Sequence, residues 1–249
     1  METATRRRHT DVTVTMSLVL IAAAAWWTTA RLAAQTPTMS TAMTLVPYLL
    51  GWVAMMAAMM LPAVTPVVRL YARAAALHRV APTAVFTLGY LLLWCATGIP
   101  AWFLWRAVSI LLMNGQVGAY RASGAVLLAA GVYQLTPLKR ACLRHCRSPM
   151  GVFLGAGSDL ATFSGAIRAG ATHARYCLGC CIGLMVVVVA AGSMQLWWAV
   201  VIAAVIFLER NVPAGEHLAS AAAMALCVLG LVVLVHPGAI STLIQGGMS

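Results

Sequence analysis

The sequence predicts an all-α fold, a polytopic transmembrane helical bundle of about seven spans. Of the 249 residues, 62% are hydrophobic and only 8% are charged, and the mean hydropathy is +0.91. A soluble globular domain carries about 25% charged residues, so this chain cannot cover a water-facing surface and a soluble enzyme is excluded. The apolar runs are continuous rather than alternating, which in lipid indicates helices and not a β-barrel.

Seven segments contain the roughly 20 predominantly apolar residues that a span needs, and together they form one transmembrane domain, residues 1–249. The predicted spans are residues 14–34, 45–68, 83–105 and 118–138, two spans within 177–208, and 217–235. The stretch 177–208 is too long for one ordinary helix, so we expect a tight hairpin at Gly192 and Ser193. The first segment is interpreted as a span rather than a signal peptide, because it is long and no A-x-A-like cleavage site stands out.

The distribution of basic residues predicts a cytoplasmic N-terminus. With that orientation, 13 of the 16 lysines and arginines lie on the cytoplasmic side, and the exceptions are Arg31, Arg106 and Arg121. This bias follows the positive-inside rule, so membrane topology explains the net charge of +11. The sequence contains no aromatic-interleaved basic stripe and no recognisable nucleic-acid module, so we expect no nucleic-acid partner.

Five of the seven cysteines lie in two groups at the two ends of a predicted cytoplasmic segment, about residues 139–176. The groups are Cys142 with Cys146, and Cys177 with Cys180 and Cys181. The first two are four residues apart, which places both thiols on one face of a helix. Cys177 and Cys180 form a C-x-x-C at the start of the predicted fifth helix, where the helix dipole favours thiolate over thiol. We expect the two groups to meet at the cytoplasmic membrane surface.

The segment between these groups is expected to hold a short helix at the membrane interface. Ser158 and Asp159 supply an N-cap, and a mildly apolar run follows as far as Ala171. The segment is too apolar to be disordered, which favours a helix that lies on the membrane or re-enters it.

The cysteine groups predict a metal site. Thiolates are soft ligands that suit Cu(I), Zn(II) or an iron–sulfur cluster, and His145 and His173 lie near enough in sequence to complete a mixed shell. The alternative is that the cysteines are small apolar packing residues. We expect copper, and we keep zinc or an iron–sulfur cluster as alternatives.

The centre of the second predicted span is rich in methionine and contains Met55, Met56, Met59 and Met60. Thioethers can pass Cu(I) along a membrane path, and Met39 and Met43 extend the set toward the outer side. Pro62 and Pro66 are expected to kink this helix and to free backbone carbonyls. Packing between helices also explains the methionines, and it is the interpretation that we favour over a copper relay.

Several polar residues end predicted spans. Gln134, Glu209 and Arg210 are interpreted as capping or snorkelling groups at the interface, with Glu209 paired to an arginine of a loop. No spacing indicates nucleophilic catalysis, nucleotide binding or a pair of catalytic carboxylates. A binding protein is therefore expected rather than an enzyme.

Three blocks of the chain carry a family resemblance: residues 52–66 with an AMMLP core, residues 133–149 with TPLK-x-x-CL-x-x-C, and residues 173–185 with YCLGCC. On these motifs the chain resembles a bacterial family of predicted metal-binding integral membrane proteins that have no assigned biochemical role. The resemblance implies a membrane protein with a cysteine-based metal site, and it does not imply a particular metal.

We therefore expect a multi-pass protein of the bacterial inner (cytoplasmic) membrane that binds a soft metal, with a role in metal handling or delivery to a cuproprotein. Its expected partners are membrane lipids and either another membrane protein or a second copy of the chain. One alternative is an accessory subunit of a larger membrane complex, such as a metal-dependent oxidase or monooxygenase, with structural cysteines. Another is a thiol redox membrane enzyme, although a cytoplasmic location argues against a stable disulfide.

Overall fold

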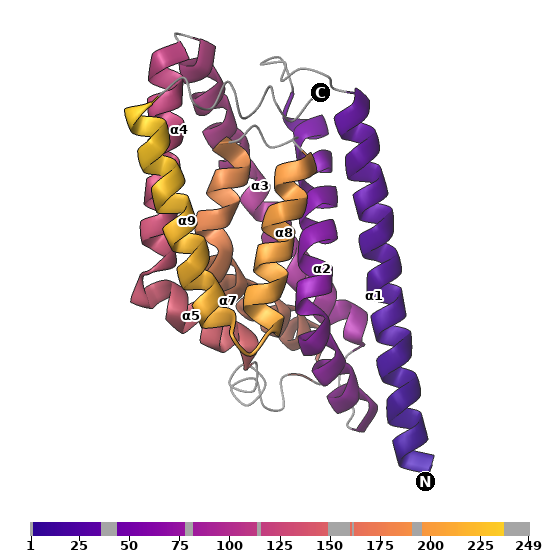
Figure 1. Cartoon of the computed structure of the whole chain (residues 1–249). Helices are drawn as coiled ribbons and strands as arrows, with labels where there is room; N and C mark the ends of the chain where they lie inside the picture. The colour runs from indigo at the N-terminus through magenta and orange to yellow at the C-terminus, as the bar shows by residue number, and fades with distance from the viewer. Residues whose placement is uncertain are drawn as a thin grey trace.

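The computed structural model describes residues 2–35, 44–77, 82–113, 116–148, 160, 162–190 and 196–236, and every regular element within them is a helix. The helices are α1 (Glu2–Gln35), α2 (Leu45–Leu77), α3 (Thr83–Met113), α4 (Gln116–Gln134), α5 (Pro137–Arg147), α7 (Phe163–Ala190), α8 (Leu196–Asn211) and α9 (Gly215–Val235). Figure 1 shows the long helices side by side in one bundle, with the short α5 at one end. The predicted all-α fold is confirmed.

Among the described residues, five helices are long and apolar enough to cross a membrane, which indicates a multi-pass membrane protein. Their candidate spans are His9–Ala34, Leu45–Ala74, Thr83–Ile110, Phe163–Ala190 and Gly215–Val235. By contrast, α8 has 16 residues, or about 24 Å at 1.5 Å per residue, and α4 carries Arg121 among its 19 residues. The predicted seven spans therefore correspond to five long apolar helices, with α4 and α8 packed beside them.

The predicted end of the fourth span is wrong. The sequence suggested a span over residues 118–138, but α4 ends at Gln134 and a new helix starts at Pro137. Thr136 caps that helix, because its Oγ1 accepts a hydrogen bond from Lys139 N at 3.3 Å. Proline fits the first turn of a helix, where its missing N–H has no partner to lose. The chain therefore turns sharply here, and α5 packs back against α7.

The predicted start of the fifth spanning helix is also wrong. Helix α7 begins at Phe163 and is continuous through Cys177, so the expected interfacial helix is instead the first part of a long helix. Thr162 fixes this start, since its Oγ1 accepts a hydrogen bond from Gly165 N at 3.0 Å. The predicted N-cap at Ser158 and Asp159 lies outside the described residues, as does the expected hairpin at residues 192–193.

The centre of the bundle is formed by α2, α3 and α7. Helix α1 packs along α2, and α4 pairs with α9 at the other side (Figure 1). Helix α2 continues through Pro62 and Pro66. The outer surface carries exposed apolar side chains such as Leu20, Phe103 and Trp197, as expected for a surface that faces lipid.

Helices α3 and α7 approach closely at Gly170. A Cβ atom at this position would collide with the backbone carbonyl oxygen of Phe86, so only glycine fits. Ala166 and Ala169 are buried on the same part of α7, and small residues of this kind let helix backbones approach in a membrane. The contact fixes the position of Tyr90 on α3 relative to the cysteines of α7.

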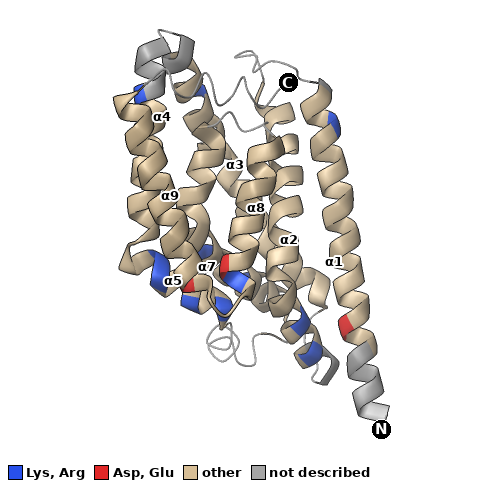
Figure 2. Cartoon of the chain, in the orientation of Figure 1, with Lys and Arg blue, Asp and Glu red and all other residues tan. Residues whose placement is uncertain are grey.

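Charged residues gather at one end of the bundle. Figure 2 shows most of the described lysines and arginines at the end where α5 lies, together with the acidic residues. At this end Asp11 of α1 forms ion pairs with Arg69, at 3.1 Å, and with Arg73. Most of the described basic residues that the sequence assigned to a single membrane side therefore lie at one end of the bundle.

Candidate metal centre

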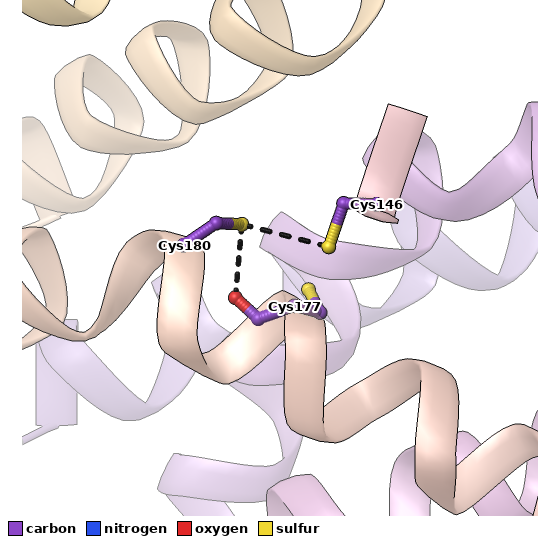
Figure 3. A group of neighbouring side chains, drawn as sticks. All are labelled: Cys146, Cys177 and Cys180. Carbon is purple, nitrogen blue, oxygen red and sulfur yellow. Dashed lines mark hydrogen bonds between the residues drawn. The ribbon is translucent and has the colours of Figure 1, made fainter. Parts of the chain in front are cut away.

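Three cysteine sulfurs from two helices lie next to one another at the basic end of the bundle (Figure 3). Cys146 comes from α5, and Cys177 and Cys180 come from α7. Their Sγ atoms all lie within 4.8 Å of one another, and the three residues are buried. The Sγ of Cys180 lies 3.7 Å from that of Cys146 and donates to Cys177 O at 3.0 Å. The two cysteine-bearing stretches therefore meet, as the sequence predicted.

The position of Cys177 differs from the expected one. It lies in the middle of α7 rather than at its first turn, so the helix dipole does not act on its sulfur as we expected. Two other groups contact this sulfur instead. Arg210 Nη1 of α8 donates to Cys177 Sγ at 3.0 Å, and Tyr90 Oη of α3 lies 3.1 Å from it. A guanidinium and a phenol at these distances stabilise negative charge on the sulfur.

Arg210 is a buried cation without a carboxylate partner among the described residues. Its Nη2 lies 3.5 Å from His173 Nε2. Its Nε and His173 Nδ1 are both buried and have no hydrogen-bond partner in the described part of the chain. Because a buried charge needs a counter-charge, the sulfurs are the nearest groups that can supply one.

A second buried charge lies in the same region and is fully paired. Lys139 Nζ donates to Glu209 Oε2 at 2.7 Å and also to Gln134 Oε1, and Gln134 Nε2 donates to Glu209 Oε1 at 3.1 Å. All three side chains are buried. The interpretation of Gln134, Glu209 and Arg210 as interfacial caps is therefore wrong, and the partner of Glu209 is a lysine of α5 rather than a loop arginine.

A family model that describes the PpoB2 copper chaperones matches residues 49–233. The chain belongs to this PpoB2 copper chaperone family. The matched region runs from α2 to α9 and includes the three clustered cysteines, Tyr90 and Arg210. No curated protein and no solved structure matches the chain. Membership of a copper chaperone family agrees with the metal binding expected from the sequence.

The other predicted ligands of this PpoB2-family chain lie around the cluster. Cys181 is buried, and its Sγ donates to Cys177 O at 3.0 Å. Cys142 is half-buried on α5 and faces Gly179 of α7, where an added Cβ would lie 2.5 Å from Cys142 Sγ. His145 is exposed, and its ring stacks on Tyr176 at 4.6 Å between centroids.

The two cysteines of α5 are held as neutral thiols in the metal-free chain. Burial raises the pKa of the Cys142 thiol. Hydrogen bonds with Cys177 and Cys180, together with burial, raise the pKa of the Cys146 thiol well above its usual range. A metal ion that binds Cys146 must therefore displace its proton.

The four methionines of the predicted relay are all buried. Met55, Met56, Met59 and Met60 belong to the apolar core around α2, where they fill space between helices. Met39 and Met43 lie outside the described residues. A relay through these thioethers stays a prediction.

Sequence reasoning missed three parts of the site. Tyr90 gave no signal, because a single tyrosine in an apolar helix is ordinary. Lys139 and Glu209 are 70 residues apart, so only the tertiary fold reveals their pairing. Arg210 follows Glu209 at the end of the apolar run of α8, and an arginine in the last turn of a helix of only 16 residues could have indicated a buried cation.

Proposed function

We propose that this chain holds Cu(I) as cargo on Cys146, Cys177 and Cys180 and delivers it to a partner cuproprotein. The observation that carries the proposal is the convergence of three buried sulfurs within 4.8 Å of one another. Membership of the PpoB2 copper chaperone family supports copper as the metal. Thiolate sulfur is a soft ligand that selects Cu(I) over harder cations.

The charge of the site supports two thiolates on the copper at one time. Cu(I) with two thiolates carries a single negative charge, and the Arg210 guanidinium beside Cys177 neutralises it. A third thiolate would leave a buried negative charge, which costs several kcal/mol in a protein interior. The third cysteine of the cluster then stays a thiol that can replace a departing ligand. Such an exchange of ligands is what a copper carrier requires.

The number of clustered sulfurs favours copper over the other metals that the sequence left open. Structural zinc sites take four ligands, and iron–sulfur clusters are held by four cysteines. The cluster in the described part of the chain offers three sulfurs, and Cu(I) is stable with fewer sulfur ligands than zinc.

The proposed location is the cytoplasmic face of an inner membrane. The cluster includes Cys146 of α5, the short helix at the basic end of the bundle (Figure 2), and basic residues mark the cytoplasmic side of membrane proteins. Copper is loaded at this face. The recipient is a cuproprotein of the membrane or of the compartment on the other side, which also fits an accessory role within a larger membrane complex.

Copper retention by single-cysteine variants tests the site. Full-length protein is purified without oxygen, loaded with Cu(I), challenged with a Cu(I) chelator and then assayed for copper per chain by elemental analysis. Wild type is expected to retain copper, and Cys146→Ser and Cys177→Ser are expected to retain less of it, because each leaves two sulfurs and no third one to replace a departing ligand. Cys95→Ser is the matched control, because Cys95 lies on α3 outside the cluster. Equal retention by wild type and Cys177→Ser would refute the site.

A thiol redox function is the second candidate, and the 3.7 Å separation of the Cys146 and Cys180 sulfurs favours it. It predicts that a mild oxidant removes a pair of titratable thiols from the wild type reversibly, and that the purified protein carries no copper. Thiol titration on the samples used for copper analysis separates the two functions.

A further inference from the structure

A cavity of about 390 Å³ opens beside the cysteine cluster, between α2, α5 and α8. Cys146 and Arg210 are both part of its lining, so the cavity reaches the cluster from one side. Cys177 and Cys180 are not among the residues that line it. Cys146 is therefore the sulfur that a ligand in this cavity meets first.

The lining of the cavity is strongly basic. Arg69, Arg73, Arg147 and Arg210 all contribute to it, and no acidic residue of the described part of the chain does. Asp11 forms ion pairs with both Arg69 and Arg73, so two guanidiniums share one carboxylate. The cavity therefore has an excess of positive charge, in low-dielectric surroundings that strengthen its attraction for anions.

The guanidiniums keep unused capacity for an anionic ligand. Arg147 Nη2 donates to the carbonyl oxygens of residues 212 and 213, at 2.7 Å and 3.2 Å, and it has no carboxylate partner among the described residues. The buried Nε of Arg210 has no hydrogen-bond partner there either. The side chains of Arg69 and Arg73 are 38% and 46% exposed, so an incoming anion can reach them.

We propose that this cavity binds an anionic Cu(I) complex of a small thiol that carries carboxylates, and that Cys146 takes the copper from it. The inference rests on the proposed function and identifies the class of molecule that supplies the copper. The cavity falls within the 300–1,000 Å³ typical of small-molecule sites, which suits a tripeptide-sized carrier rather than the surface of a protein. The carboxylates and the negative charge of the bis-thiolate complex match the arginines.

The transfer is a ligand exchange without a change of oxidation state. The thiol sulfur of Cys146 forms a bond to Cu(I), one carrier thiolate leaves, and the Cys146 proton goes to that leaving thiolate. A second exchange bonds the Cys177 thiolate to Cu(I) and releases the other carrier molecule as a thiolate, which takes its proton from solvent. The copper complex carries one negative charge before and after each step.

Binding of S-methylglutathione to the metal-free, full-length protein tests the cavity without copper. This probe has the carboxylates of a small thiol carrier, but its sulfur is blocked. Isothermal titration in lipid nanodiscs is expected to show binding to wild type that weakens with salt, and a loss of about tenfold in Arg147→Gln. Arg147→Lys keeps the charge and should retain most of the affinity.

Arg144→Gln is the matched control, since Arg144 lies on the same helix and its side chain is 68% exposed and paired with Glu216. It should bind the probe as wild type does. No binding to wild type at millimolar probe, or equal binding by wild type and Arg147→Gln, overturns the proposal.

Copper transfer rates provide the second readout. Cu(I) supplied as its anionic glutathione complex should load Arg147→Gln about tenfold more slowly than wild type, whereas cationic Cu(I)–acetonitrile should load both at similar rates. An equal loss with both donors contradicts a carrier site. If the probe binds but no copper is retained, the proposed function fails and the anion cavity stands. If copper is retained but the probe does not bind, the cavity proposal alone fails.

Discussion

Two buried cations lie at the same end of the bundle, and they differ in what neutralises them. Lys139 is paired with the Glu209 carboxylate at 2.7 Å and with Gln134. Arg210, the next residue along α8 from Glu209, instead faces the Cys177 sulfur at 3.0 Å and His173 at 3.5 Å. The first cation carries its counter-charge permanently, whereas the second obtains one only when a neighbouring thiol ionises.

This difference separates a structural charge from a functional one. A carboxyl group has an ordinary pKa of about 4.3 and a thiol one of about 8.5. Near neutral pH a stranded glutamate must therefore stay charged in the interior or take up a proton at a cost in free energy, whereas a stranded cysteine is protonated without that cost. Removal of Lys139 therefore destabilises the fold, and removal of Arg210 does not. Substitution of Lys139 by an uncharged residue should therefore lower the stability of the fold, whereas the same substitution of Arg210 should lower the affinity for copper.

The largest effect is expected from Lys139→Met. This variant leaves Glu209 buried without its cation, which typically costs about 3–5 kcal/mol of folding free energy. Thermal unfolding of the metal-free protein in detergent, followed by circular dichroism, measures the loss. Adding Glu209→Gln to Lys139→Met should restore most of the stability, because both charges are then gone. Arg144→Gln, which breaks an exposed pair, should change stability by about 0.5 kcal/mol or less. A single variant as stable as wild type would show that the pair is not structural.

Arg210→Met should affect copper and not the fold. Loss of the guanidinium removes the charge that stabilises a thiolate at Cys177, and changes around metal ligands typically cost about 10–100-fold in metal affinity. Competition with a Cu(I) chelator measures the affinity, and thermal unfolding of the metal-free protein serves as its control. If Arg210→Met lost much of its stability but kept its affinity for copper, Arg210 would be a structural cation and the proposed role in copper binding would be wrong.

The pH dependence of copper binding should also differ between wild type and Arg210→Met. A thiol with a raised pKa, such as that of Cys146, must lose its proton to bind copper, so affinity falls as pH falls. Each proton released changes the affinity about tenfold per pH unit. The variant should release one proton more than wild type, because Cys177 is then also a thiol. Chelator competition between pH 6 and pH 8, about the range where both proteins stay folded, tests this slope. Equal slopes would mean that Arg210 does not hold a thiolate.

The smallest effect is expected from Cys142→Ser. Cys142 faces Gly179 and does not belong to the group of three sulfurs, so copper retention should match that of wild type. Elemental analysis after the chelator challenge measures it, with Cys146→Ser as the positive control on the same helix. Loss of copper from Cys142→Ser would extend the site to a fourth cysteine.

Much of the architecture could be predicted because it depends on local sequence. Continuous apolar runs give the helices, most of the described basic residues lie at one end, and the two cysteine groups identified the stretches of chain that meet. The wrong predictions concern helix ends, because capping residues and helix packing, rather than hydropathy, decide where α4, α5 and α7 begin and end. Thr136 and Pro137 end one helix and start another within an apolar run, and α7 extends through a stretch of low hydropathy because its small residues pack against α3.

The environment of the sulfurs could not be predicted, because it depends on tertiary contacts. Tyr90, Lys139 and Arg210 come from three different helices, and a local pattern links only Lys139 to a cysteine, in the TPLK-x-x-C motif. Charged residues at helix ends were assigned to the interface because most such residues lie there. The fold instead buries them, since α5 turns back over the end of α8.

Gly179 shows how a residue that binds nothing can set the dimensions of a metal site. A glycine inside a helix costs about 0.5–1 kcal/mol relative to alanine, and α7 carries one directly beside the cysteine pair. The missing methyl group leaves room for the sulfur of Cys142, which a Cβ would approach to 2.5 Å, and so lets α5 lie against α7. The missing side chain at Gly179 therefore sets how closely α5 approaches α7. This approach in turn sets the distance from Cys146 on α5 to Cys177 and Cys180 on α7.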